Sequence, residues 1–128
     1  MPIEPVPTPS APGTNLPYSP AVRAGDWIVM AGQVGLDPAT GTLAEGVEAQ
    51  VRQVMANIVA VLGDCGAALT DVAKATVFLT DMSDFPVLNE AYSAAFAGHR
   101  PARTTIGVAA LPFGAKVEIE VLAYQPQT

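Results

Sequence analysis

Charge is scarce in this sequence. Only 14% of its 128 residues are charged and 50% are hydrophobic, whereas about a quarter of a typical soluble domain is charged. A small monomer has the most surface per unit volume and should need surface charge most. We therefore expect other copies of the chain to cover part of the apolar surface, which predicts a homo-oligomer.

Cysteine and histidine are almost absent. Cys65 is the single cysteine and His99 the single histidine. One cysteine excludes an intramolecular disulfide framework and a cysteine-based metal cluster, and one histidine excludes the usual histidine-rich metal sites. We expect no bound metal, and a reducing cytoplasm is the expected location.

Basic residues are also few. Six lysines and arginines stand against twelve acidic residues, for a net charge of −6. Nucleic-acid backbones are bound by clustered basic side chains, whereas those of this chain are scattered. No apolar run approaches the roughly 20 residues that cross a bilayer, and residues 1–5 lack the basic start and apolar core of a signal peptide. We expect neither nucleic acid nor a membrane as a partner.

The length fits one domain, which we expect to span residues 1–128. Proline recurs through residues 2–20, and a proline nitrogen cannot donate to a strand ladder. We therefore expect residues 1–16 to form an extended, proline-rich arm that contains one edge strand.

Apolar periodicity predicts two helices. Apolar side chains recur at steps of three and four along residues 45–65, and Gly66 supplies a C-terminal stop. A second helix is expected from a cap at Ser83 or Asp84 to about Ala97. Strands are expected over residues 27–31, 71–80, 102–109 and 115–124. The order predicts a two-layer α+β domain, with one sheet and two helices on one of its faces.

The last expected strand alternates in character. Because successive side chains of a strand point to opposite faces, one face carries Val117, Ile119, Val121 and Ala123. The other face carries Glu118, Glu120, Leu122 and Tyr124. If the aliphatic face packs on the helices, the opposite face presents two carboxylates beside apolar side chains. Such a mixed face suits a subunit interface that contains a functional site.

Arg103 and Glu118 are the first candidates for chemistry. Alternation places Arg103 and Thr105 on one face of their strand, and a guanidinium can bind a carboxylate through two parallel hydrogen bonds. A plain salt bridge explains Arg103 equally well. A carboxyl group among apolar neighbours has its charged form disfavoured, so Glu118 can serve as a general acid or base near neutral pH. A solvated strand face is the simpler interpretation of Glu118.

Other side chains carry weaker signals. Cys65 lies on the apolar stripe of the first helix, where core packing is expected, and His99 is expected in a loop. Asn89, in the second helix, and Tyr18, between two prolines, can each be structural or point to a site. The sequence contains neither a glycine-rich phosphate loop nor a Gly-x-Ser-x-Gly motif. The catalytic groups that remain are arginine, glutamate, tyrosine, asparagine and water. These groups restrict the possible activity to mild reactions.

Several short sequence motifs occur one after another along the chain. The most specific are Pro101-Ala102-Arg103 and Val117-Glu118-Ile119-Glu120. Others are Pro17-Tyr18-Ser19, Gly32-Gln33, residues 37–41, Asn57-Ile58, residues 76–82, Asp84-Phe85, Asn89 and Leu111-Pro112. Through these motifs the chain resembles the RidA/YjgF family of reactive-intermediate deaminases, from about residue 17 to residue 124.

The resemblance implies a fold and an assembly. It implies a chorismate-mutase-like α+β domain with one mixed sheet, assembled as a homotrimer around a central barrel, with sites between subunits. It also implies that Arg103 grips the substrate carboxylate and that Glu118 positions or activates the attacking water. Tyr18 would act from the neighbouring subunit to close the site. The other residues that match positions near the ligand are Gly32, Asn89 and Thr105.

The implied activity is that of a hydrolase acting on C–N bonds, a 2-iminobutanoate/2-iminopropanoate deaminase without a cofactor. It would convert a small 2-imino acid, such as the imine from 2-aminoacrylate, to a 2-keto acid and ammonia. The alternatives are a small-carboxylate (2-keto acid) binding module and a chaperone-like module, both without turnover. Ala31 and Thr105 stand where many members of the family carry serine and cysteine, which bears on substrate range.

The catalytic hypothesis depends on one arrangement. We expect Arg103 and Glu118 on two adjoining strands, with their side chains converging in a shared crevice where they orient a small acid for attack by water. Side chains that point into different compartments of the molecule would remove the basis of the hypothesis.

Overall fold

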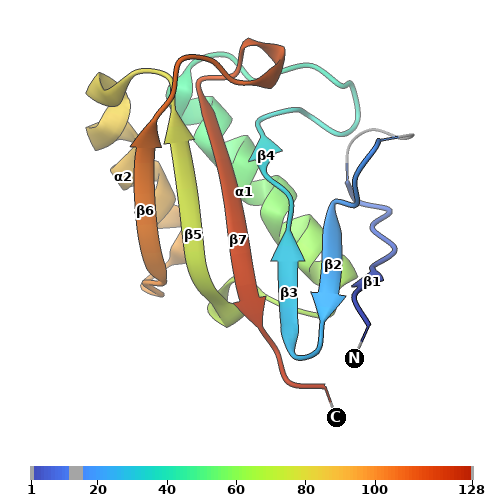
Figure 1. Ribbon diagram of the computed structural model, residues 1–128. Coiled ribbons are helices and arrows are strands. Elements are labelled where there is room, and N and C mark those ends of the chain that lie inside the picture. Colours follow the sequence, from blue (N-terminus) through green and yellow to red (C-terminus); the bar gives the residue numbers. More distant parts are fainter. Residues whose placement is uncertain (1, 12–15, 128) are drawn as a thin grey trace.

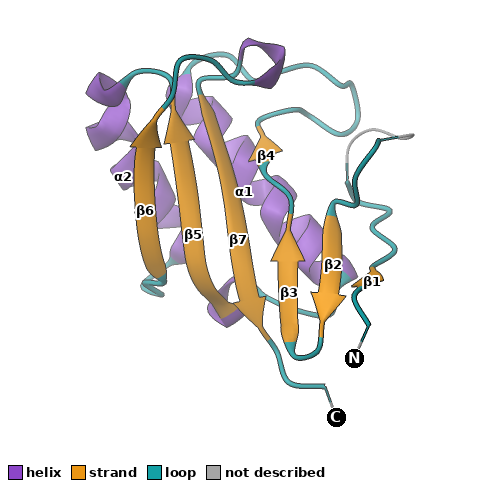
Figure 2. Ribbon diagram, viewed as in Figure 1, coloured by secondary structure: helices purple, strands orange, loops and turns teal. Residues whose placement is uncertain are grey.

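The computed structural model describes residues 2–11 and 16–127. It has two layers, a sheet and two helices that cover one face of that sheet (Figures 1 and 2). The helices are α1 (Val47–Asp64) and α2 (Phe85–Phe96). The strands are β1 (Glu4–Pro5), β2 (Ala21–Ala24), β3 (Trp27–Met30), β4 (Gln33–Val34), β5 (Val72–Leu79), β6 (Ala102–Gly107) and β7 (Val117–Tyr124).

The sheet is mixed. Its strands follow the order β1-β2-β3-β7-β5-β6, and β4 also pairs with β7. β5 and β6 run parallel and are connected through α2, whereas the other pairs are antiparallel. The α+β class, the single mixed sheet and the two helices on one face confirm the sequence prediction.

The core lies between the helices and the covered face of the sheet. The buried residues of β7 are those that alternation placed on one face, Val117, Ile119, Val121 and Ala123. The buried side chains of α1 recur at three- and four-residue steps. Burying one aliphatic side chain contributes about 1.5–3 kcal/mol, so this interface supplies most of the driving force for folding.

Local signals set the ends of the helices. Gly66 follows α1 with a φ of 76°, a left-handed conformation that glycine adopts without steric cost. Asp84 occupies the N-cap position of α2, one of the two positions expected, but its side chain accepts no capping bond. Asp81 instead accepts a bond from the Ser83 amide, at the short turn before α2. Within the described residues, no helix combines the length and the hydrophobicity needed to cross a membrane.

Two buried amide side chains of α1 hold neighbouring segments against the helix. Asn57 Nδ2 donates to the carbonyl oxygens of Val34 and Leu36, at 3.2 and 2.9 Å. Gln50 Oε1 accepts a bond from the Lys116 amide at 2.8 Å. Because a buried amide costs free energy unless it is bonded, these contacts fix β4 and the start of β7 relative to α1.

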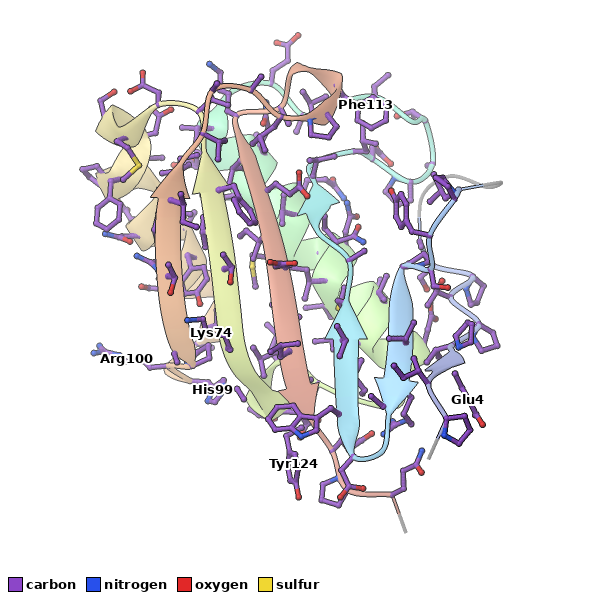
Figure 3. The ribbon with its side chains drawn as sticks, viewed as in Figure 1. Glu4, Lys74, His99, Arg100, Phe113 and Tyr124 are labelled. Atoms are coloured by element: carbon purple, nitrogen blue, oxygen red, sulfur yellow. The ribbon has the colours of Figure 1, made fainter. Side chains whose placement is uncertain are left out.

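The face of the sheet away from the helices, which we call the open face, is covered by no element of the described chain (Figure 2). Its large apolar side chains that are exposed in a single chain are Trp27, Val29, Ile106, Leu122 and Tyr124. Lys74 and Tyr124 can be seen on this face in Figure 3. The open face also carries Glu118 and Glu120, so the mixed face expected from the alternation of β7 is confirmed.

Candidate active site

Arg103 lies on the helix side of the edge strand β6. It pairs with Ala75 of β5, which is buried under the helices, and paired residues of neighbouring strands share a face. The guanidinium Nη2 donates to Asn89 Oδ1, on α2, at 2.7 Å. Of the two interpretations open for Asn89, the structure supports the one in which it points toward a candidate site.

Two aromatic rings of α2 enclose the guanidinium. Arg103 Cζ is 4.8 Å from the centroid of the Tyr92 ring and 5.5 Å from that of Phe85, distances at which cation–π attraction operates. Among the described residues no ion pair joins Arg103 to an acid, so the plain salt bridge is not found there. A fixed guanidinium without a carboxylate partner is available to bind an anion.

Thr105 follows Arg103 on the same side of β6. It pairs with the buried Val77 of β5. Its Oγ1 is buried and has no hydrogen-bond partner among the described residues. A buried polar group without a partner costs about 1–3 kcal/mol, so a ligand that supplied the missing bond would gain free energy. A cavity of about 560 Å³ opens beside Arg103, between α2 and the loop that leads to β6.

Glu118 lies on the open face of β7, against Gly32. A Cβ at Gly32 would overlap the Glu118 carboxylate, so the missing side chain leaves room for it. Glu118 is half-buried, and burial raises the pKa of its carboxyl group. The nearby charge of Glu120 raises the same pKa further. A carboxyl group with a raised pKa accepts a proton more readily than an ordinary carboxylate does.

A second cavity of about 270 Å³ adjoins Gly32. Its lining includes Tyr18, Gly32, Gln33 and Phe113. Phe113 lies beyond the upper ends of the strands in Figure 3, and the Tyr18 side chain is 55% exposed in the single chain. The structure therefore brings Tyr18 and Gly32 to one cavity, on the side of the molecule that carries Glu118.

Arg103 and Glu118 do not converge within one chain. The expectation that they lie on adjoining strands is wrong, because β5 lies between β6 and β7. The connection through Pro112–Gly114 passes the end of β5 and places β7 on its far side. Arg103 shares the helix side with Ala75, whereas Glu118 shares the open face with Phe78.

The predicted site residues therefore form two half-sites in each chain. The arginine half-site consists of Arg103, Asn89 and Thr105. The glutamate half-site consists of Glu118, Gly32 and Tyr18. Arg103 bonds Asn89 and shares a strand face with Thr105. Gly32 contacts Glu118 and shares a cavity with Tyr18. The Arg103 and Glu118 side chains thus point into different compartments of a single chain, which removes the basis for a catalytic site within one chain. Convergence between copies of the chain stays a prediction about the assembled protein.

Sequence reasoning missed the two rings that enclose Arg103. Phe85, Asn89 and Tyr92 recur at steps of four and three, which places them on one face of α2, so the signal was present. Cys65 is buried and His99 lies in the loop between α2 and β6, as expected. In the part of the chain that the structure describes, no group of three or more histidine, cysteine, aspartate or glutamate side chains is placed to hold a metal.

Comparison with known proteins covers almost the whole chain. Residues 8–125 match the family model described as Endoribonuclease L-PSP. A 2-iminobutanoate/2-iminopropanoate deaminase of Mus musculus is 44% identical over 119 residues, 92% of this chain and 88% of the mouse protein. RidA from the Antarctic bacterium Psychrobacter sp. PAMC 21119 superposes with a TM-score of 0.89 at 46% identity, over 93% of this chain and 97% of that one. E. coli TdcF with bound serine superposes with a TM-score of 0.90 at 35% identity, over 95% and 98% of the two chains. The chain therefore belongs to the Endoribonuclease L-PSP family, the family of the RidA and YjgF proteins.

Proposed function

We propose that this protein is a cofactor-independent deaminase that hydrolyses small 2-imino acids to 2-keto acids and ammonia. One observation carries the proposal: each chain holds an unpaired guanidinium and a desolvated carboxyl group on opposite faces of its sheet. The name of the mouse relative supports the reaction. The serine bound to TdcF supports a small ligand that has a carboxylate.

The two half-sites meet between copies of the chain, in a homotrimer. The open face leaves Trp27, Leu122 and Tyr124 exposed in a single chain, and contiguous apolar patches of this kind mark interfaces. In a closed ring each copy uses two different surfaces, one toward each neighbour. The glutamate half-site of one copy then faces the arginine half-site of the next, and Tyr18 closes the crevice from the glutamate side.

Arg103 binds the carboxylate of the imino acid. Its planar fork donates two parallel hydrogen bonds, while Asn89 and the rings of Phe85 and Tyr92 hold it in place. The Thr105 hydroxyl, which has no partner among the described residues, donates to the same ligand. Fixing the carboxylate fixes the neighbouring C2 atom, which is the atom that water attacks.

Glu118 moves the protons. As the water oxygen forms a bond to C2, the Glu118 carboxylate takes a proton from the water, and the electrons of the C=N bond pass to nitrogen. Glu118 then returns the proton to nitrogen, which gives a carbinolamine. Glu118 next takes the proton of the C2 hydroxyl and delivers it to the same nitrogen, so the C–N bond breaks with ammonia as the leaving group and the keto group forms. The raised pKa of Glu118 suits a group that accepts a proton in one step and releases it in the next. Imines hydrolyse readily in water, so the reaction needs no metal.

The direct test is release of 2-ketobutyrate from freshly generated 2-iminobutyrate, above the rate in buffer. We expect Arg103→Ala to lower kcat/KM by at least about a hundredfold, because the carboxylate loses a charge-assisted bidentate contact. Arg52→Ala, on the exposed face of α1, is the matched control and should leave the rate unchanged. A wild-type rate equal to that of buffer would reject the deaminase. Calorimetric binding of 2-ketobutyrate without turnover would instead indicate a binding module for small carboxylates.

RNA cleavage, which the description of the family model names, is not favoured by the charge of this chain. The net charge is −6, and nucleic-acid backbones require clustered basic side chains. Arg52 is paired with Glu48, and Arg23 donates to main-chain carbonyl oxygens. A gel shift at physiological salt is expected to show no RNA binding.

A further inference from the structure

We propose that the cavity beside Arg103 holds a second anionic group, so that dicarboxylic 2-imino and 2-keto acids of four or five carbons are preferred ligands. This inference rests on the proposed function, because it takes Arg103 as the group that binds the first carboxylate. The second carboxylate would bind toward Arg100, at the rim of the same cavity.

The distribution of the arginines supports a dianion. Arg52 pairs with Glu48 at 3.3 Å, and Arg23 donates to two main-chain carbonyl oxygens at 3.2 Å. Arg100 and Arg103 form no ion pair with an acid of the described chain, and both line this cavity. No aspartate or glutamate is among its described lining residues. In a chain of net charge −6, the cavity is therefore a local site of positive potential.

The loop between α2 and β6 holds Arg100 at the rim. Ala97 and Gly98 both have positive φ, 51° and 98°, so the chain turns sharply where α2 ends. His99 Nε2 bonds a main-chain carbonyl of β5 at 2.8 Å, and Pro101 restricts the backbone before β6. Figure 3 shows His99 and Arg100 together at the lower end of β6, with Arg100 extended outward. A guanidinium in this position can fold over a ligand whose other end is bound to Arg103.

The size and lining of the cavity fit a ligand larger than a three-carbon imine. Its volume is about 560 Å³, whereas the six non-hydrogen atoms of 2-iminopropanoate occupy on the order of 100 Å³, the share of three or four waters. Tyr92 also lines the cavity and is 7% exposed, and its hydroxyl has no hydrogen-bond partner among the described residues. This one cavity thus combines room for a ligand with two guanidinium groups that have no acidic partner among the described residues and a hydroxyl that has no hydrogen-bond partner there.

The test compares 2-ketoglutarate with its 5-methyl ester, which has nearly the same shape but lacks the second charge. Isothermal calorimetry at pH 7 and low salt should give a Kd for 2-ketoglutarate up to about fivefold lower than that of the ester, the range of a partly exposed ion pair. This ratio should fall as salt is raised. In Arg100→Gln the ratio should approach one, whereas Arg52→Gln, which removes the same charge elsewhere, should keep the wild-type ratio.

Two outcomes overturn the inference while leaving the proposed function intact. One is equal affinity of the wild-type protein for the two ligands, and the other is an unchanged ratio in Arg100→Gln. Failure of the proposed function has different signatures. If Arg103 does not bind the first carboxylate, 2-ketobutyrate, the ester and 2-ketoglutarate all bind no more tightly to the wild-type protein than to Arg103→Ala, and if the protein is no deaminase, its rate of 2-ketobutyrate release equals that of buffer.

Discussion

At the scale of single residues, Gly32 leaves the space that the Glu118 carboxylate occupies. A methyl group at this position would overlap the carboxylate, which would then have to turn away from its place on β7. We predict that Gly32→Ala lowers kcat/KM for 2-iminobutyrate at least about tenfold, because small displacements of a catalytic group are costly. The rate of 2-keto acid release measures the effect. Gly63→Ala on α1 is the control, since no atom lies near its added Cβ, and a wild-type rate in Gly32→Ala would contradict the assignment.

The neighbouring acid on β7 gives a prediction of pH dependence. The charge of Glu120 disfavours the carboxylate form of Glu118 and so contributes to its raised pKa. Glu120→Gln removes that charge, so the pKa of Glu118 should fall. Since Glu118 acts first as a carboxylate, activity is lost as the pH falls through this pKa. The acidic limb of kcat/KM against pH should therefore move to lower pH. A limb that moved to higher pH would refute the proposed role of Glu118.

At the scale of elements, the amides of α1 couple the helix to the segment that follows Gly32. Asn57 is 3% exposed and donates to two carbonyl oxygens at the end of β4 and beyond. We predict that Asn57→Ala lowers the free energy of unfolding by about 1–3 kcal/mol, since the part-buried carbonyl oxygens of Val34 and Leu36 each lose a hydrogen bond. Urea unfolding at a fixed protein concentration measures this loss as a lower midpoint. Arg52→Ala, on the same helix but exposed, should cost no more than about 0.5 kcal/mol, and an equal loss in both variants would contradict the account.

The elements differ in how far the sequence predicts them. The helices, β5 and β7 have long apolar patterns, and the structure confirms them. The short strands β2 and β4 have no such pattern over four and two residues. Their pairing depends on partners distant in the sequence, Pro5 and Ile119 among them. The sequence likewise does not show which backbone groups the amide side chains of Gln50 and Asn57 bind. An amide within an apolar stripe can bond to several neighbouring segments.

The same limit explains the error about Arg103 and Glu118. Strands that follow each other in the sequence are neighbours in about two-thirds of cases, and β6 and β7 follow each other. In this fold β7 lies between β3 and β5 instead. Strand order depends on packing across the whole sheet, so the motifs give candidate site residues but do not show which strands are neighbours.

At the scale of the whole molecule, the low charge and the apolar open face both support the proposal of a homotrimer. In a single chain Trp27, Val29 and Leu122 of the open face remain at least 37% exposed. In the proposed trimer, the contact that covers them also brings the half-sites of different copies together. Catalysis in this account is therefore a property of the trimer, and an isolated chain should be inactive even when it is folded.

The most direct measurement is the activity of mixed trimers. Arg103→Ala and Glu118→Gln should each be inactive alone while assembling normally, as checked by light scattering. When the two variants are co-expressed in equal amounts, sites that combine Arg103 of one chain with Glu118 of the next are restored. Random assembly into three-membered rings predicts about a quarter of the wild-type activity. A mixture as inactive as either variant alone would show that the two residues do not act across a subunit boundary, and would contradict the central claim.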